Sequence, residues 1–271
     1  MYLKNLLEKD KTTITKTYLQ GGQGNLSAEI IKNLKVFVPL LPEQKKIVEF
    51  LSLVDERIEQ QRQLVEALKR YKRGVINGIF DNKLYGKNWN NYKLSDVLKE
   101  RNTFCEKDGT FEHVTLSKDG ISPKTERYDR DYLVATDDKR YKITKLYDIC
   151  YNPANMKFGV ICLNTYGNAI FSPIYVTFEI ANGFDKNVVA FCLTRQNFIN
   201  KTLKYQQGTV YERMAVSPED LLSMNVELPD LESQTKLSNQ LLLFEAIINK
   251  ENQLLLMLQE TKRCLLQQMF I

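Results

Sequence analysis

The stretch PLLPEQKKIVEFLSLVDERIEQQRQLVEALKRYKRGVINGIF at residues 39–80 decides the fold, because a related stretch returns 190 positions later. The second copy is PDLESQTKLSNQLLLFEAIINKENQLLLMLQETKRCLLQQMF at residues 229–270. The correspondence extends upstream without a gap to Ser27 and its counterpart Ser217. An internal repeat of this kind indicates that the fold uses one structural unit twice.

Apolar residues recur in both copies at alternating steps of four and three, which is the heptad pattern of a helix with one buried edge. Proline and acidic residues precede each run, as they often do at helix starts. The spacing predicts two helices of about 35 residues, each roughly 50 Å long. The predicted seam residues are Ile47, Leu51, Val54, Ile58, Val65, Leu68, Val75 and Ile79, then Leu237, Leu241, Phe244, Ile248, Leu255, Leu258, Leu265 and Met269.

A helix with one apolar edge cannot bury that edge alone, so the two copies are expected to pack on each other. If the intervening segment is compact, its ends lie close together, and the pair is then antiparallel. Polar residues interrupt both seams at equivalent places, namely Gln61 and Lys72 in the first copy and Glu251 and Lys262 in the second. Polar seam residues lower stability, but they can fix the register or face a partner, and both roles stay open.

Residues 81–216 have a different character, because Gly, Asn, Asp and aromatic residues punctuate short apolar runs. A segment of about 135 residues is long enough to be an independent domain, and its pattern is typical of a mixed α+β fold. We predict strands at Ile161–Leu163, Ile174–Phe178 and Val188–Leu193, and short helices at Leu94–Arg101 and Gln196–Tyr205.

The N-terminal stretch TYLQGGQGNLSAEIIKNLKVFVP at 17–39 parallels KYQQGTVYERMAVSPEDLLSMNVELP at 204–229. Both place a Gln-Gly turn before a helix that a serine would cap, and then a short strand that ends in proline. The predicted fold class is α+β, with a mixed domain between two long helices that form an antiparallel coiled coil. The predicted parts are the end of a first module at 1–40, helices at 41–80 and 231–271, and a whole module at 81–230.

Composition narrows the function only slightly. The 38 Lys and Arg against 33 Asp and Glu give a net charge of +5, which suits a nucleic-acid binder without requiring one. No signal peptide or bilayer-length apolar run is evident, so we expect a cytoplasmic protein without membrane contact. The one histidine is His113, and the cysteines form no CxxC pair, so we expect no metal site. The cysteines are Cys105, Cys150, Cys162, Cys192 and Cys264.

The helical stretch at 38–80 resembles the helical region of the specificity subunits of type I restriction–modification systems. Further stretches resemble the target recognition domain of that family, namely YKLSDVLKE, LYDICYNPANMKFGVI, FSPIYVTFEI and GTVYERMAVSPEDLLSMNVELP. The resemblance covers nearly the whole chain. The Pro-x-x-x-Glu-Gln helix start, repeated after a recognition domain, is fairly specific, although Ser233 replaces the glutamate in the second copy.

The resemblance implies a non-catalytic subunit that reads double-stranded DNA, in which each target domain recognises one half of a split site. The antiparallel helices would act as a spacer and as a platform for methyltransferase subunits, and restriction subunits would join the complex. S-adenosylmethionine, ATP and Mg would then belong to the partner subunits, and none to this one. Most of a first target domain is not seen, which implies a half-size subunit. Two such chains could pair as a homodimer on a symmetric split site.

The family has no short motif for DNA contacts, so candidates follow from residue type alone. Lys and Arg suit phosphates, and Arg, Asn, Gln and Lys suit base edges. The candidates are Lys118, Lys124, Arg127, Lys139, Arg140, Lys142, Tyr151, Asn152, Asn155, Lys157, Gln206, Gln207, Tyr211 and Arg213. Each could instead be an ordinary surface residue. Basic residues off the helical seam could touch methyltransferase or phosphate, or simply be solvated; they are Arg57, Arg62, Arg70, Arg73 and Lys250.

Enzyme alternatives match the sequence poorly. Asn152-Pro153-Ala154-Asn155 lacks the second proline and the aromatic residue of a methyltransferase loop, and GGQGNLS at 21–27 follows no convincing buried strand. Asp230, Glu232 and Lys236 imitate a nuclease pattern, but they stand at a duplicated helix start. No Gly-Lys-Ser/Thr phosphate loop occurs. The remaining alternative is a coiled-coil module that binds a protein and does not read DNA.

Overall fold

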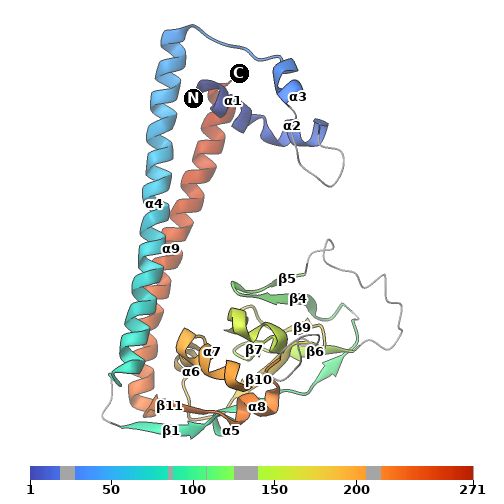
Figure 1. Ribbon diagram of the computed structural model, residues 1–271, viewed down its shortest axis with the longest axis vertical. Helices are drawn as coiled ribbons and strands as arrows, with labels where there is room; N and C mark the ends of the chain where they lie inside the picture. The colour runs from blue at the N-terminus through green and yellow to red at the C-terminus, as the bar shows by residue number, and fades with distance from the viewer. Residues whose placement is uncertain (19–27, 85–87, 108, 125–139, 206–214, 271) are drawn as a thin grey trace. The chain divides into compact units, whose positions relative to one another are not determined.

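The computed structural model describes residues 1–18, 28–84, 88–107, 109–124, 140–205 and 215–270 (Figure 1). The chain divides into two compact units. The helical unit comprises residues 1–72 with 243–271, and the globular unit comprises residues 73–242. Two long helices, α4 (Leu41–Asp81) and α9 (Leu231–Met269), contribute to both units. Within the described part of the chain, no helix has the length and apolar character that a bilayer crossing requires.

The long helices run antiparallel within the helical unit, as predicted from the repeat (Figure 1). Residues later along α4 meet residues earlier along α9. Asp55 contacts Lys262 at 2.9 Å, and Gln61 contacts the side chain of Glu251 at 2.6 Å. Further along α4, Lys72 forms an ion pair with Glu245. The sequence-based prediction of an antiparallel helix pair is therefore confirmed.

The contacts across this helix pair reproduce the internal repeat. Gln61 and Glu251 are equivalent residues in the two copies, and they meet each other, with an additional bond from Gln61 Nε2 to the Glu251 carbonyl oxygen at 3.1 Å. The Lys72–Glu245 ion pair is the repeat image of the Lys262–Asp55 ion pair. A local two-fold relation therefore holds between the helices near Gln61, and the polar seam residues pair across the seam.

All the predicted seam residues are buried or half-buried. Short helices accompany the pair in the helical unit, namely α1 (Tyr2–Lys9), α2 (Lys11–Tyr18) and α3 (Ala28–Asn33). Helix α1 adds Tyr2 and Leu6 to an apolar cluster with Leu51, Leu266 and Phe270. The rings of Tyr2 and Phe270 lie 5.1 Å apart. The N-terminal helix is therefore part of the core of this unit.

Three sheets form the globular unit. A two-stranded sheet pairs β1 (Trp89–Lys93) with β11 (Asn225–Pro229). The four-stranded sheet has the order β2 (Leu98–Glu100), β10 (Val176–Ile180), β7 (Ile149–Tyr151), β8 (Ile161–Leu163). The five-stranded sheet has the order β3 (Phe104–Cys105), β6 (Tyr141–Thr144), β9 (Ala169–Phe171), β4 (Glu112–Ser117), β5 (Gly120–Pro123). The described strand pairs are antiparallel except for β4 with β9.

A core cluster that includes Val114, Cys150 and Phe171 joins residues of the larger sheets. The globular unit also contains the short helices α5 (Leu94–Val97), η3 (Pro153–Phe158), α6 (Lys186–Leu193), α7 (Gln196–Thr202), η4 (Leu203–Tyr205) and α8 (Pro218–Ser223). The predicted mixed α+β domain between two long helices is therefore confirmed.

The helix starts confirm part of the predicted repeat. The Ser217 hydroxyl accepts a hydrogen bond from the Asp220 N–H at 3.0 Å and caps α8, as predicted. Its counterpart Ser27 lies outside the described residues. At the starts of the long helices, Gln44 Nε2 donates to the Pro39 carbonyl oxygen at 2.9 Å. Gln234 makes the equivalent bond to Pro229 at 2.7 Å.

Two local predictions were wrong. Residues Val188–Leu193 were expected to form a strand, but they lie in α6, because the Asp185 side chain accepts hydrogen bonds from the N–H groups of Asn187 and Val188. A short buried apolar run does not distinguish helix from strand. The helix expected over Leu94–Arg101 ends at Val97, and the next three residues form β2 against β10.

Candidate nucleic-acid interface

Several predicted DNA contacts lie on neighbouring elements of the globular unit. Lys118 is exposed in the turn between β4 and β5, and Lys124 follows β5. Asn155 and Lys157 lie in η3, which joins β7 to β8. Strand β5 contacts β8, so the hairpin and η3 adjoin the same strand. Arg140 is exposed before β6, which β9 and β4 separate from β5 in the sheet.

The prediction is wrong for Tyr151 and Asn152. Tyr151 is completely buried, its ring stacks on Phe178, and its hydroxyl donates to the Val216 carbonyl oxygen at 3.1 Å. Burial raises the pKa of the Tyr151 phenol, so this hydroxyl stays protonated. The Asn152 side chain accepts a hydrogen bond from the Ala154 N–H at 3.1 Å and caps η3. Both residues therefore support the fold and are not available to DNA.

Lys142 is also unavailable, although it belongs to a predicted basic group. Its side chain is buried, and Nζ donates to Glu100 Oε1 at 2.6 Å and to Asn102 Oδ1 at 3.1 Å. The same ammonium lies 5.6 Å from the centre of the Phe104 ring. Lys142 therefore faces neighbouring side chains and not solvent. The remaining candidates lie outside the described residues: Arg127, Lys139, Gln206, Gln207, Tyr211 and Arg213.

Sequence reasoning missed a network of charges centred on Arg101. Arg101 donates Nε to Asp148 Oδ2 at 2.8 Å and a terminal nitrogen to Asp148 Oδ1 at 3.0 Å. The same guanidinium also reaches Glu179 at 3.2 Å. The hydrogen bond to Asp148 is the largest cause of a raised Arg101 pKa. No sequence spacing links these residues, because the four-stranded sheet brings them together.

This network lines a depression that also contains Lys145, Tyr147 and Lys186. Lys186 lies against the face of the Tyr147 ring, which is a cation–π contact. Tyr147 has a positive φ of 71°, and its N–H donates to the Asn164 carbonyl oxygen at 2.7 Å. The carboxylates of Asp148, Glu179 and Asp185 equal the three cations in number, so the depression lacks the basic excess of a phosphate site.

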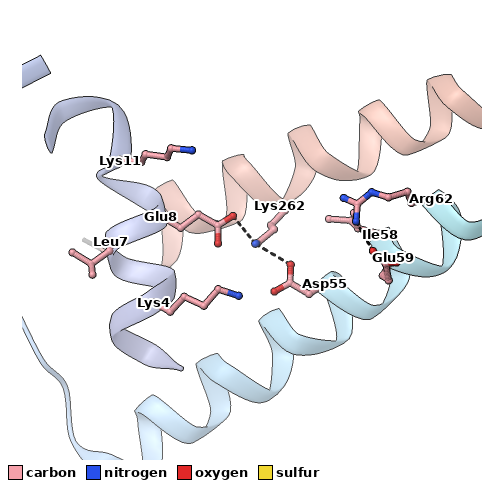
Figure 2. A pocket seen from close by; sticks show the side chains of 9 residues that line it. All are labelled: Lys4, Leu7, Glu8, Lys11, Asp55, Ile58, Glu59, Arg62 and Lys262. Atoms are coloured by element: carbon pink, nitrogen blue, oxygen red, sulfur yellow. Dashed lines mark hydrogen bonds and ion pairs between the residues drawn. The ribbon is translucent and has the colours of Figure 1, made fainter. Parts of the chain in front are cut away.

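A second pocket lies within the helical unit, between α1 and the long helices (Figure 2). Lys262 lies at its centre, 2.7 Å from a Glu8 oxygen and 2.9 Å from an Asp55 oxygen. Burial alone would lower the pKa of Lys262, but the hydrogen bonds to both carboxylates outweigh it, and the pKa is raised. Lys262 therefore stays charged and ties α1 to both long helices. The other lining residues are Lys4, Leu7, Lys11, Ile58, Glu59 and Arg62.

The described architecture defines a class of protein in which a mixed α/β domain is inserted between two repeated helices that pair antiparallel. Residues 1–70 match the family model for the type I restriction modification DNA specificity domain. The matched segment includes most of the first copy of the internal repeat. The second copy begins at residue 217. Residues 1–70 are therefore similar to the DNA specificity domain of type I restriction–modification systems.

Solved structures share this fold over nearly the whole chain. The S subunit of the type I restriction–modification system from M. genitalium is 15% identical, with a TM-score of 0.61, over 100% of this chain and 72% of that one. A second solved structure comes from work on the complex assembly and conformational transition of the type I R-M system. It is also 15% identical, with a TM-score of 0.55, over 99% of this chain and 70% of that one.

Proposed function

We propose that the chain is a non-catalytic DNA-specificity subunit whose module at residues 81–230 reads one half of a split DNA site. The paired helices then set the distance between half-sites and hold methyltransferase subunits. The observation that carries this proposal is the two-fold set of helix contacts, in which the Lys72–Glu245 and Lys262–Asp55 ion pairs are repeat images. A symmetric scaffold suits a protein that serves two half-sites.

The partners follow from this role. S-adenosylmethionine, ATP and Mg act in the methyltransferase and restriction subunits of a cytoplasmic complex, and this subunit supplies DNA recognition. In the described ranges, no group of three or more His, Cys, Asp or Glu side chains is arranged to hold a metal ion. Two copies of the chain would together supply two modules for a symmetric site. Sedimentation at micromolar concentration measures this pairing, and a stable monomer would count against it.

We place the DNA contacts on the β4–β5 hairpin and on η3, where Lys118 and Lys157 are exposed. Lys124 and Asn155 lie on the same neighbouring elements and are half-buried. Lysine ammonium groups suit phosphate oxygens, and the Asn155 amide suits a base edge or a phosphate. This arrangement predicts that the lysines contribute affinity by releasing counterions from DNA.

The double variant Lys118→Ala/Lys157→Ala tests this surface. Its DNA affinity is expected to fall, and the slope of log K against log salt should become shallower by about 0.9 for each phosphate that a lysine no longer neutralises. The measurement is a salt titration by fluorescence anisotropy, with the methyltransferase subunit present. The DNA duplex carries the modified sequence that methylome sequencing identifies in cells that hold this gene.

Lys99→Ala is the matched control. Lys99 is exposed on β2, at the opposite edge of the four-stranded sheet from β8, so its replacement should leave the slope unchanged. An unchanged slope for the double variant, or an equal change for Lys99→Ala, would refute this contact surface. A chain that binds the methyltransferase subunit but neither binds DNA nor directs its modification would instead be a protein–protein module.

A further inference from the structure

The segment Lys35–Pro39 is an extended connection between α3 and α4 (Figure 1), and it is the repeat counterpart of β11. We call it the open segment. In the globular unit β11 pairs with β1, but none of the described strands pairs with the open segment. The first copy of the repeat therefore holds the equivalent of β11, and the described part of the chain supplies no equivalent of its partner strand.

Apolar side chains occupy both faces of the open segment and are exposed. Val36 is 42% exposed, Val38 is 51% exposed, and Phe37, which alternates with them, is 77% exposed. In β11 the equivalents of the two valines are buried, whereas the equivalent of Phe37 is the exposed Glu227. A charged outer residue suits a strand with water on one side. The open segment instead has the composition of a strand that is covered on both faces.

One backbone edge of the open segment is occupied within the helical unit. The carbonyl oxygen of Phe37 accepts a hydrogen bond from the Tyr2 hydroxyl at 3.4 Å. The carbonyl oxygen of Pro39 accepts one from Gln44 Nε2 at 2.9 Å. In an extended segment, residues two apart direct their backbone groups to the same edge. The chain itself therefore covers the edge to which Phe37 and Pro39 point.

The repeat shows which edge binds a strand. At the end of β11, the Asp230 N–H donates to the Asn88 carbonyl oxygen at 3.2 Å, on the side of β1. Steps of two from Asp230 lead to Leu228 and Val226, so these residues direct their backbone groups to β1 as well. The strand-binding edge of β11 is therefore the edge of Val226 and Leu228.

The equivalent edge of the open segment is free within the described ranges. Its residues are Val36 and Val38, the repeat counterparts of Val226 and Leu228. No hydrogen bond is found for the backbone N–H and C=O groups of the two valines among the described residues. A strand edge with unpaired backbone groups is a template for another strand. The open segment therefore presents the edge that β11 uses to bind β1.

A second copy of the open segment would satisfy these backbone groups. An antiparallel pair centred on Phe37 places Val36 of each copy opposite Val38 of the other, and each such pair exchanges N–H···O=C bonds. The two Phe37 rings then face each other in a non-hydrogen-bonded pair, where side chains approach closely. Lys35 lies opposite Pro39, so no like charges meet. The open segment is therefore complementary to itself in both hydrogen bonding and charge.

We propose that the open segment is a self-complementary strand-pairing site through which two copies of this chain associate as a symmetric dimer. The inference rests on the proposed function, since it names the surface that brings two recognition modules together. Each copy keeps its own antiparallel helix pair, and the copies join where each α4 begins. A strand pair of this size is a small interface, so we expect an affinity in the micromolar range.

The test measures association of the full chain by sedimentation velocity at micromolar concentrations. Phe37→Glu places two carboxylates opposite each other and should weaken association by about tenfold or more. Phe37→Lys should have the same effect with two ammonium groups. An equimolar mixture of the two variants should associate again as a one-to-one dimer, because unlike charges then face each other. Circular dichroism checks the fold of each variant.

A second pair of variants tests the backbone bonds. Val36→Pro removes an N–H from the free edge and should weaken association by about tenfold. Lys35→Pro is the matched control, because it removes an N–H that points to the other edge. It should change the dissociation constant by less than about threefold.

The outcomes separate this inference from the proposed function. If the wild-type chain pairs but the Phe37 variants pair equally well, or their mixture does not recover, the copies meet elsewhere and only the inference fails. A wild-type chain that stays monomeric, or that takes up a strand of a different polypeptide at this edge, would also overturn it. DNA reading is measured independently by the salt titration, so a chain that pairs through Phe37 without binding DNA would contradict the proposed function alone.

Discussion

Replacement of Arg101 by methionine is expected to lower the free energy of unfolding of the globular unit by about 3–5 kcal/mol. Arg101 holds both carboxylate oxygens of Asp148, whose side chain is only 3% exposed. Without the guanidinium, a buried carboxylate keeps the Lys145 N–H at 2.7 Å as a partner but loses its compensating charge. Urea unfolding followed by the fluorescence of Trp89, the one tryptophan of the chain, measures the decrease in stability.

Glu179→Gln provides the control within the same network. Glu179 also contacts Arg101, but its side chain is 60% exposed, so its replacement should change stability by less than about 1 kcal/mol. If the two variants lower stability equally, the Arg101–Asp148 pair does not stabilise the unit in the way that its burial suggests. The stability of this sheet bears on the proposed DNA contacts, because β7 leads directly into η3, which carries Asn155 and Lys157.

Replacement of Leu51 by alanine is expected to lower the stability of the helical unit by about 2–5 kcal/mol. Leu51 is completely buried and packs with Tyr2 and Leu6 of α1 and with Leu266 and Phe270 at the other chain end. Truncation leaves a cavity where α1 meets the long helices. Hydrogen exchange measured by mass spectrometry should therefore show faster exchange in α1 and in the first turns of α4.

Leu53→Ala is the control, since it makes the same chemical change two residues away on the same helix. Leu53 is 65% exposed, so the expected decrease in stability is below about 0.5 kcal/mol. Comparable exchange in both variants would contradict the position of Leu51 in the apolar cluster. The comparison also shows whether the exposed position Leu53 can be substituted without a loss of stability in the helical unit.

The helix pair could be predicted because its signal is local and occurs twice. Heptad spacing marks the buried edge of each helix. Because the repeat supplies two such edges, they are expected to pack on each other. The cap at Ser217 was predictable for a similar reason, since a serine before an acidic helix start satisfies a backbone N–H of its own segment. The helical structure of the run from Val188 to Leu193 was not predictable, because uniform burial removes the periodicity that distinguishes a helix from a strand.

The candidate DNA contacts were less predictable. Residue type selects lysine, asparagine and tyrosine, but it does not tell which of them the fold buries. Lys142 and Tyr151 were predicted on the same grounds as Lys118 and Lys157, and they lie in the interior. Exposure depends on the strand order of sheets that join distant segments, and no local pattern reports that order.

By itself, the sequence determined that two repeated helices exist, which edge of each is apolar, and that a mixed domain lies between them. These features depend on the spacing of apolar residues over a few helical turns. Only the tertiary structure decided that Gln61 meets Glu251 and that Arg101 holds Asp148. The physical reason is that such contacts join residues far apart in the chain, so their energies depend on packing and burial that no local spacing encodes.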